Sequence, residues 1–368
     1  MKIKVCHITT VHPTFDNRIY HKECKSLLAD GYEVHLIVAN GKTELVDGIF
    51  IHGVKVNYTN RLSRFIKAPF AVVNAALLIQ ADVYHFHDPE ILLACNKLLR
   101  YGKKVIYDVH EDLPKQILNK YYIPAFLRYF LSVLVGAYEK MKAKKLSGII
   151  TTVPTITNRF LKYNPRVTEV CNYPSLQQME MPVDWKLKTD SICYIGGLTQ
   201  VRGVVELINA MENSNLQLHL AGQFSPADLE TQCKQLKGWQ QVIYHGFVDR
   251  NDIQKILGIS KIGMVTLYPI PNYDEAYPVK MFEYMSAGIP VICSNIPLWE
   301  KIVTENKCGI SVDPKDKSAI AKAVSDLLSN ESLMKEMGKN GRQAIEQKFN
   351  WNNEEEKLTG LYKQILAS

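Results

Sequence analysis

The chain has 368 residues, of which 46% are hydrophobic and 22% charged, and this composition excludes a disordered chain, a collagen and a coiled coil. At about 150 residues per domain, the length predicts two domains that each bury a core. Residues 1–175 carry 24 Lys and Arg against 14 Asp and Glu, whereas the remainder carries 20 against 23. The basic charge therefore belongs to the N-terminal half, where it favours anionic partners.

The chain shows no signal for secretion or for a membrane span. Uncharged apolar stretches such as 129–138 are much shorter than the ~20 residues that a bilayer requires. The N-terminus lacks a small-residue cleavage site, so we expect a cytoplasmic protein without a signal peptide. Eight cysteines are scattered without a C-x-x-C pair, which argues against disulfides and against a zinc site built from cysteines.

Short β-branched runs alternate with helical patterns through the first 152 residues. Such alternation predicts a parallel sheet with crossover helices. The predicted strands are 3–9, 34–38, 83–86, 105–109 and 148–152, and the predicted helices are 20–29, 71–79 and 91–99. A polar, turn-rich stretch over 172–182 then predicts an interdomain linker.

A second alternating series follows the linker and predicts another doubly wound domain. Its predicted strands are 192–195, 216–221, 242–244, 262–266, 291–294 and 309–312. Two such domains in series predict a cleft between the carboxyl ends of the two sheets, where open α/β sheets bind ligands. The tail over 351–365 predicts a last helix with one apolar face, formed by Leu358, Leu361, Tyr362 and Ile365.

The segment 275–292 contains the densest functional pattern. Pro278 suits a first helical position and Gly288 suits the left-handed residue after a helix, so a helix is predicted between them. Its free amide groups suit a diphosphate, and Lys280 in the first turn opposes the helix dipole unless an anion binds there. Glu275 and Glu283 flank this terminus, as expected for carboxylates that bind the sugar and the ribose of a nucleotide sugar. The alternative is two surface acids at the start of a helix.

A glycine turn follows the first strand of the second domain. Gly196 and Gly197 would let the backbone approach a ligand, and Arg202 could bind phosphate oxygens in bidentate fashion. A G-x-G-x-x-G fingerprint is absent, and an ordinary turn with a solvated arginine is the alternative.

Polar residues close two strands of the N-terminal domain, at the sheet edge where ligands bind. His85, His87, Asp88 and His110 resemble a metal-binding set, but alternation along a strand is expected to separate neighbours, so no metal is predicted. The first loop lies at the same edge and is expected to close over an acceptor. The acceptor-side candidates are His12, Asp16, Arg18, His87 and Asp88.

Two basic segments, 61–67 with the apolar run after it and 115–145, look like amphipathic helices for an anionic membrane surface. Core helices with solvated lysines are the alternative.

Taken together, these residues resemble the retaining glycosyltransferases of family 4, which have the GT-B architecture of two Rossmann-like domains. The resemblance covers nearly the whole chain. Its most specific element is the E-x7-E motif from Glu275 to Glu283, and the segment 349–351 with the terminal helix resembles the family's last helix, which crosses back onto the N-terminal domain.

The resemblance implies roles for the site residues. Glu275 would contact the donor sugar, Glu283 would bind the ribose, and His110 matches a histidine that touches the donor sugar in relatives. The glycine turn resembles the family pattern G-R-L-x-x-x-K-G, but Gly197 stands at its Arg position and Arg202 at its Lys position. One phosphate cation is therefore missing, and Lys280 is the candidate to replace it. The predicted donor-binding set is Gly196, Gly197, Arg202, Pro278, Val279, Lys280 and Glu283, with Glu275 and His110 catalytic.

The resemblance also implies an overall function. Residues 1–173 with 351–368 would bind the acceptor, and residues 174–350 would bind the donor. The enzyme would need neither a metal ion nor a cofactor, and it would bind no nucleic acid. It would move a hexose or N-acetylhexosamine, with retention, from a UDP sugar to a lipid-linked saccharide, at the inner face of the cytoplasmic membrane. Two alternatives stay open: a nucleotide-sugar 2-epimerase and a sugar-nucleotide-binding module without catalysis.

Overall fold

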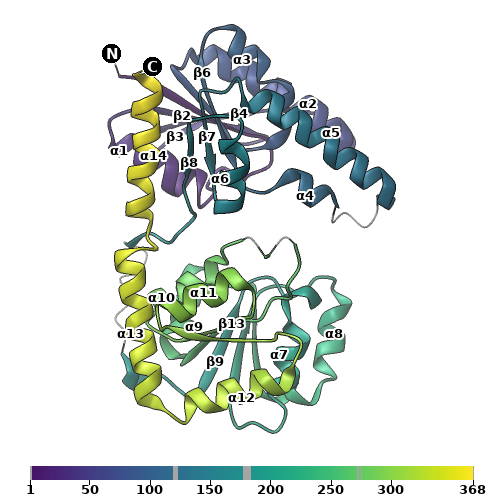
Figure 1. Ribbon diagram of the computed structural model, residues 1–368, viewed down its shortest axis with the longest axis vertical. Helices are drawn as coiled ribbons and strands as arrows, with labels where there is room; N and C mark the ends of the chain where they lie inside the picture. The colour runs from purple at the N-terminus through teal and green to yellow at the C-terminus, as the bar shows by residue number, and fades with distance from the viewer. Residues whose placement is uncertain (1, 119–122, 177–183, 272, 275, 368) are drawn as a thin grey trace. The chain divides into compact units, whose positions relative to one another are not determined.

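The chain divides into two compact units, each with its own sheet (Figure 1). The computed structural model describes residues 2–118, 123–176, 184–271, 273–274 and 276–367. The N-terminal unit is Met1–Asn172 together with Trp351–Ser368, and the C-terminal unit is Tyr173–Asn350.

The sheet of the N-terminal unit has eight strands, and its central strands are buried on both faces. The predicted strands are all present and pair in parallel. Three strands were not predicted: the three-residue strands β3 and β8 at the two edges of the sheet, and the six-residue strand β4, which lies between β3 and β2 and pairs with β3 in antiparallel fashion. In spatial order the strands are β3 (Glu44–Val46), β4 (Ile49–Val54), β2 (Glu33–Ala39), β1 (Lys4–Thr9), β5 (Val83–Phe86), β6 (Lys104–Val109), β7 (Gly148–Thr151) and β8 (Val167–Glu169).

The helices of this unit differ from their predicted bounds at several places. The predicted helix 20–29 is a π-helix followed by an α-helix, and the predicted helix 91–99 is a 3₁₀-helix followed by an α-helix. The helices are η1 (Ile19–Cys24), α1 (Lys25–Ala29), α2 (Arg61–Ile79), η2 (Pro89–Leu93), α3 (Asn96–Arg100), α4 (Leu113–Leu118), α5 (Ala125–Ala143) and α6 (Pro154–Leu161).

Helix α2 joins the basic segment 61–67, expected as an amphipathic helix, to the predicted helix 71–79, and Asn60 caps it by accepting a hydrogen bond from the Ser63 amide. Its segment Leu62–Ile79 is long and apolar enough to cross a membrane, with 28% of that window buried in the unit. This segment was not predicted as a membrane span because it contains Arg64 and Lys67 and is therefore not an uncharged stretch. The helix packs one face against β1 and β2 and leaves large apolar side chains such as Leu62, Ile66 and Leu78 exposed.

The last helix, α14 (Trp351–Leu366), belongs to the N-terminal unit and lies beside β7, β8 and η1 (Figure 1). Its predicted apolar face is buried in the hydrophobic core of that unit, together with Val34, Val83 and Ile150. The prediction that the terminal helix returns to the N-terminal domain is therefore confirmed.

The six strands of the C-terminal unit are all parallel and were all predicted. In spatial order they are β11 (Val242–Gly246), β10 (Gln217–Ala221), β9 (Ser191–Ile195), β12 (Ile262–Val265), β13 (Val291–Ser294) and β14 (Gly309–Val312). The helices of this unit are η4 (Trp185–Leu187), η5 (Gln200–Arg202), α7 (Val204–Ala210), α8 (Asp228–Lys234), η6 (Lys237–Gln241), α9 (Arg250–Ile259), α10 (Val279–Ser286), α11 (Pro297–Glu305), α12 (Lys317–Leu328) and α13 (Glu331–Gln347).

All eight cysteines are free and buried. They lie in apolar surroundings, where burial raises the pKa of thiols such as Cys95 and Cys233, in each case to about 11. The cysteines are therefore small buried core residues, and thiols such as Cys95 and Cys233 stay protonated at neutral pH.

Candidate functional site

The glycine turn after β9 makes room for two cations of the C-terminal unit. Gly196 has a φ of +126°, which only glycine adopts readily, and a Cβ built on it would lie 3.1 Å from the Nζ of Lys280. A Cβ built on Gly197 would lie 3.0 Å from the Nη1 of Arg202, which donates a hydrogen bond to the Gly197 carbonyl. The two glycines, Arg202 and Lys280 are thus brought together as predicted.

Lys280 lies in the first turn of α10, with its Nζ 3.6 Å from the centroid of the Tyr194 ring. The ammonium atom is buried and has no hydrogen-bond partner within the described part of the chain. Burial lowers the pKa of Lys280 well below its usual value, and the Arg202 charge lowers it further, whereas Glu283 opposes the shift. A buried, unpaired ammonium is unfavourable, so the turn is suited to an anion that would pair with it.

The E-x7-E motif is described only in part. Glu275 lies outside the described residues. Glu283 lies on α10 and accepts a hydrogen bond of 2.6 Å from the Nη1 of Arg250, the first residue of α9. Pro278 caps α10 and Val279 is its first residue, so the helix begins one position after the predicted start. Gly288 has a φ of +65°, as predicted for the residue that ends this helix.

Sequence reasoning did not single out two residues that contact this site. Tyr194 supplies the ring beneath Lys280, and Arg250 holds Glu283. Tyr194 stands two positions before Gly196, near the carboxyl end of the parallel strand β9. Because ligands bind at that end of a parallel sheet, this position could have identified Tyr194 from the sequence. Arg250 had no such signal, because it reaches Glu283 from a helix 33 positions away in the sequence.

In the N-terminal unit, the polar residues after β5 and β6 converge on the buried carboxylate of Asp108. The guanidinium of Arg18 binds it with two hydrogen bonds, at 2.9 Å from Nε and 3.0 Å from Nη2. His110 Nε2 lies 2.9 Å and His87 Nδ1 3.2 Å from the same oxygen, Oδ2. His110 is the partly exposed member, since 22% of its side chain is accessible.

The remaining acceptor-side candidates form a second group around the first loop. Asp88 is buried and accepts hydrogen bonds from the hydroxyl of Thr9 and from the amide of Thr10. His12 lies between Asp88 and Asp16, at 3.5 and 3.4 Å, and these carboxylates raise its pKa although burial alone would lower it. His12 and Asp16 are partly exposed, whereas Arg18, His87 and Asp88 form their hydrogen bonds inside the unit. An acceptor-binding role stays a prediction for all five.

The expectation that strand alternation separates the histidines was wrong for His85 and His87. They are two positions apart and so share one face of the sheet, where their ring centroids are 4.6 Å apart. Two groups have donor atoms within 4.8 Å of one another, a spacing that a metal ion could bridge: His7, Glu23, His85 and His87, and His87, Asp108 and His110. The facing nitrogens of His7 and His87 are 2.9 Å apart, and the Nδ1 of His85 lies 2.8 Å from the Tyr362 hydroxyl, so these atoms already form hydrogen bonds.

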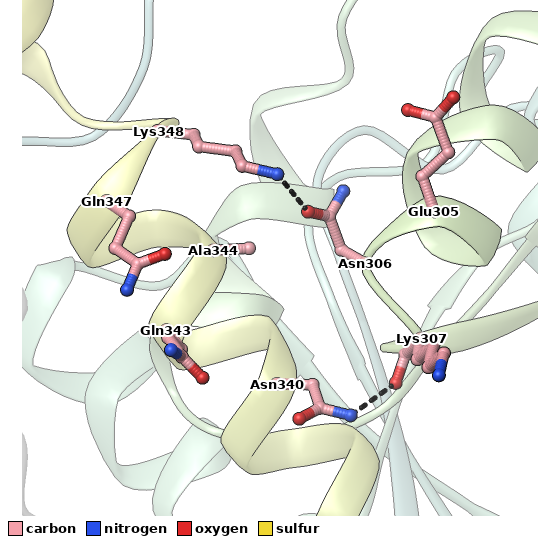
Figure 2. A pocket seen from close by; sticks show the side chains of 8 residues that line it. All are labelled: Glu305, Asn306, Lys307, Asn340, Gln343, Ala344, Gln347 and Lys348. Carbon is pink, nitrogen blue, oxygen red and sulfur yellow. Dashed lines mark hydrogen bonds between the residues drawn. The ribbon is translucent and has the colours of Figure 1, made fainter.

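A shallow hollow in the C-terminal unit lies between the end of α11 and α13 (Figure 2). Its lining is polar, and two contacts tie it together: Lys348 donates to the side-chain oxygen of Asn306, and Asn340 donates to the Lys307 carbonyl (Figure 2). None of the predicted site residues lines this hollow, so it is separate from the candidate donor site.

Each of the two units matches a family model of glycosyltransferases. The model of Glycosyltransferase Family 4 matches residues 17–172, and the model of Glycosyl transferases group 1 matches residues 180–344. The chain belongs to glycosyltransferase family 4. Its two Rossmann-like units are those of the GT-B fold, which confirms the predicted fold class.

Among curated relatives of this family 4 chain, an uncharacterized glycosyltransferase of Methanocaldococcus jannaschii is 29% identical over 177 residues, which is 47% of this chain and 44% of that relative. The O-antigen chain mannosyltransferase C of Escherichia coli is 22% identical over 332 residues, 85% of each chain. The chain therefore spans less than half of the first relative and most of the second. Among solved structures, Anabaena HepE in complex with UDP-glucose has a TM-score of 0.72 at 12% identity, over 98% of this chain and all of HepE.

Proposed function

We propose that this family 4 glycosyltransferase moves a hexose or N-acetylhexosamine from a UDP sugar, with retention of configuration, to a lipid-linked saccharide in cell-surface polysaccharide biosynthesis. The observation that carries the proposal is the buried Nζ of Lys280, which has no hydrogen-bond partner among the described residues and lies beside Arg202 and the glycine turn. The UDP donor is supported by HepE, whose structure contains UDP-glucose, and the acceptor class by the E. coli O-antigen mannosyltransferase.

In the proposed reaction, the bond between the anomeric carbon and the β-phosphate oxygen breaks. The acceptor hydroxyl oxygen forms the new bond on the same face of the sugar, and its proton passes to the leaving phosphate. Negative charge accumulates on the diphosphate, and side-chain cations placed in advance stabilise such charge. We assign this role to Lys280 and Arg202, so the proposed chemistry needs no metal ion.

The structure offers a reason why glycine at position 197 is compatible with diphosphate binding. The family pattern places an arginine there, whereas here the Arg202 guanidinium lies where a side chain on residue 197 would begin. A second charge is available from Lys280, since a Cβ built on Gly196 would lie 3.1 Å from its Nζ and 3.6 Å from the Nη1 of Arg202. We propose that these two cations replace the Arg and Lys of the family pattern.

The test begins with a thermal-shift screen of nucleotide sugars, followed by a turnover assay with a polyprenyl-diphosphate saccharide. Glu283→Gln should weaken binding of the UDP sugar by about tenfold, the effect of losing one hydrogen bond to a charged group. Glu275→Gln should lower kcat more than it weakens binding, and the control Glu305→Gln, at an exposed acid, should change neither. Wild-type affinity and turnover in both test variants would refute the site assignment.

Two other outcomes correspond to the alternative functions. Conversion of the donor without any acceptor identifies a 2-epimerase. Saturable donor binding without turnover identifies a binding module.

We also propose that the N-terminal unit rests on the cytoplasmic face of an anionic membrane. Helix α5 exposes a stripe of large apolar side chains at helical spacing while its Glu139 and Lys142 are buried, which is the reverse of a water-facing helix. The side chain of Phe126 is 79% accessible. The stripe is formed by Phe126, Tyr129, Phe130, Val133, Leu134 and Met141.

Fewer exposed lysines accompany this stripe than the sequence suggests. Lys140, Lys144 and Lys145 are exposed, but Lys142 is buried and its Nζ donates to the Asn96 side chain. Phe126→Ser with Phe130→Ser should therefore reduce partitioning onto vesicles with anionic headgroups, as should neutralising the three exposed lysines. Sedimentation with anionic and neutral vesicles measures this, and unchanged partitioning on the anionic vesicles contradicts the membrane proposal.

A further inference from the structure

A buried chain of hydrogen bonds in the N-terminal unit leads to His110. Its centre is Asp108 on β6, whose Oδ2 faces Arg18 Nε, His87 Nδ1 and His110 Nε2, while its Oδ1 faces Arg18 Nη2. The chain continues from His87 Nε2 to His7 Nδ1, 2.9 Å away. These residues come from the first loop and from three adjacent strands or the segments that follow them.

The charge on Asp108 determines where the nearest protons lie. Burial alone would raise its pKa, but the Arg18 charge, the charge of His110 when that imidazole is protonated, and the hydrogen bonds from His110 and His87 hold the pKa well below its usual value. Asp108 is therefore a carboxylate, which can only accept hydrogen bonds. It follows that His110 carries a proton on Nε2 and that His87 carries one on Nδ1.

Glu23 also contacts this cluster, with its Oε1 2.9 Å from Arg18 Nε, but it carries no charge there. It is fully buried, and burial together with the charge of Asp108 raises its pKa well above the usual value, so it is neutral. The single positive charge of Arg18 is then balanced by Asp108 alone.

The assignment extends consistently to His7. Burial lowers the pKa of His87 to about 4, so His87 is neutral at pH 7 and its Nε2 has no proton. His7 must then donate from Nδ1, and because burial also lowers the pKa of His7, its Nε2 is left without a proton. His110, His87 and His7 thus each have one tautomer, and the Asp108 carboxylate determines all three.

We infer that Asp108 is a positioning residue: it accepts a hydrogen bond from His110 Nε2–H, so the lone pair of the neutral imidazole lies on Nδ1, where it can accept a hydrogen bond from a hydroxyl of a sugar substrate. His110 is the only partly exposed imidazole of this chain of contacts, and no hydrogen bond to its Nδ1 comes from the residues that the structure describes. The tautomer follows from the contacts. Only the identity of the hydroxyl rests on the proposed function.

The tautomer is measured directly in the full chain labelled with ¹⁵N-histidine. Two-bond ¹H–¹⁵N correlation spectra at neutral pH should show His110 protonated at Nε2 and bare at Nδ1, and His87 with the opposite pattern. The signal lost in His110→Gln assigns His110. Thr152→Val is the matched control, because the Thr152 hydroxyl donates only to the His110 backbone carbonyl and its removal should leave the tautomer unchanged. A His110 protonated at Nδ1, or exchanging between tautomers, overturns the inference.

Kinetics then test whether Asp108 acts through His110. Asp108→Asn removes an acceptor, so kcat should fall about tenfold, while KM for the donor changes by less than about threefold. Asp108→Asn with His110→Gln should be no slower than His110→Gln alone, since both changes remove one shared function. A further loss in the double variant contradicts the positioning role.

A failure of the proposed function and a failure of this inference give different results. The spectrum of the unmodified chain decides the tautomer whether or not Asp108→Asn folds. Absence of any glycosyl transfer defeats the proposed function and leaves the tautomer intact, whereas transfer by a chain with His110 in the other tautomer defeats this inference alone.

Discussion

In the proposed donor site, the Lys280 side chain would combine a folding penalty with a binding advantage. Its ammonium is buried over the Tyr194 ring without a hydrogen-bond partner within the described residues, and this opposes folding of the unliganded chain. The same atom faces the glycine turn, where a diphosphate would pair with it. Such a trade of stability for function is common at binding sites.

Replacing Lys280 by methionine should therefore have opposite effects on stability and on affinity. We expect the unliganded Lys280→Met variant to be more stable by about 1 kcal/mol, because an unsatisfied buried group is removed. Its affinity for UDP should fall at least about tenfold, because one charged hydrogen bond is lost. Thermal unfolding and calorimetric titration with UDP measure the two effects. The exposed Lys301→Met is the control, and undiminished UDP affinity in Lys280→Met would count against the site.

The lowered pKa of Lys280 also predicts a pH dependence. Between that lowered pKa and the usual value near 10.5, the unfolded chain holds a proton that the folded chain has lost, so stability rises with pH through this interval. UDP favours the protonated ammonium, so UDP binding should take up a proton in the same interval. Urea unfolding between pH 7 and 10 checks the first effect, and titrations in buffers of different ionisation enthalpy check the second. Both effects should be absent in Lys280→Met.

At the scale of elements, the position of α10 depends on close packing by α13. A Cβ added at Gly338 of α13 would collide with the backbone carbonyl oxygen of Gly288, just after the end of α10. Glycine therefore lets the two segments approach closely, and it keeps the helix that bears Lys280 and Glu283 against the body of its unit. Gly360 in α14 has open space around it, so its helix gains nothing from a missing side chain.

Replacing each of these two glycines by alanine should therefore change the free energy of unfolding in opposite directions. Gly338→Ala should lower the free energy of unfolding by about 1–3 kcal/mol, because it overpacks a helix contact. Gly360→Ala should raise it by about 0.5–1 kcal/mol, because alanine loses less backbone entropy in a helix. Urea denaturation followed by circular dichroism measures both. Equal effects at the two sites would show that the α13 contact is looser than described.

At the scale of the molecule, the two units are joined in sequence twice, because the chain returns to its first unit through α14. Leu358, Leu361 and Tyr362 are buried in the N-terminal core, and Trp351 donates a hydrogen bond from its indole to Ser26. The last eighteen residues are therefore part of the N-terminal unit.

Removal of residues 351–368 should accordingly unfold the N-terminal unit and leave the C-terminal unit folded. Calorimetry should show the transition of Tyr173–Asn350 alone in the truncated chain. Leu358→Ala in the full chain should cost the N-terminal unit about 2–5 kcal/mol, and the exposed Asn352→Ala should cost little. A truncated chain that retains both transitions would refute this account of α14.

The order of strands and helices was largely determined by the sequence, because alternation of β-branched runs with helical patterns reflects local burial. All predicted strands are present, as are the helix from Val279 and its glycine stop at Gly288. The edge strands β3 and β8 were missed, since three-residue strands carry little apolar pattern, and β4 was missed although it is as long as β1. The split helices at η1 and η2 were missed because their apolar spacing does not distinguish one helix type from another.

The residues of the candidate site could be named from the sequence, but the contacts that they make depend on the tertiary structure. The motif and glycine turn identified Arg202, Lys280 and Glu283, because strand–turn–helix punctuation is local. That Arg202 occupies the space beside Gly197, that Arg250 pairs with Glu283 and that Asp108 gathers Arg18, His87 and His110 could not be deduced. These contacts join segments far apart in the chain, and only packing of the sheet and its helices sets which partner each buried charge meets.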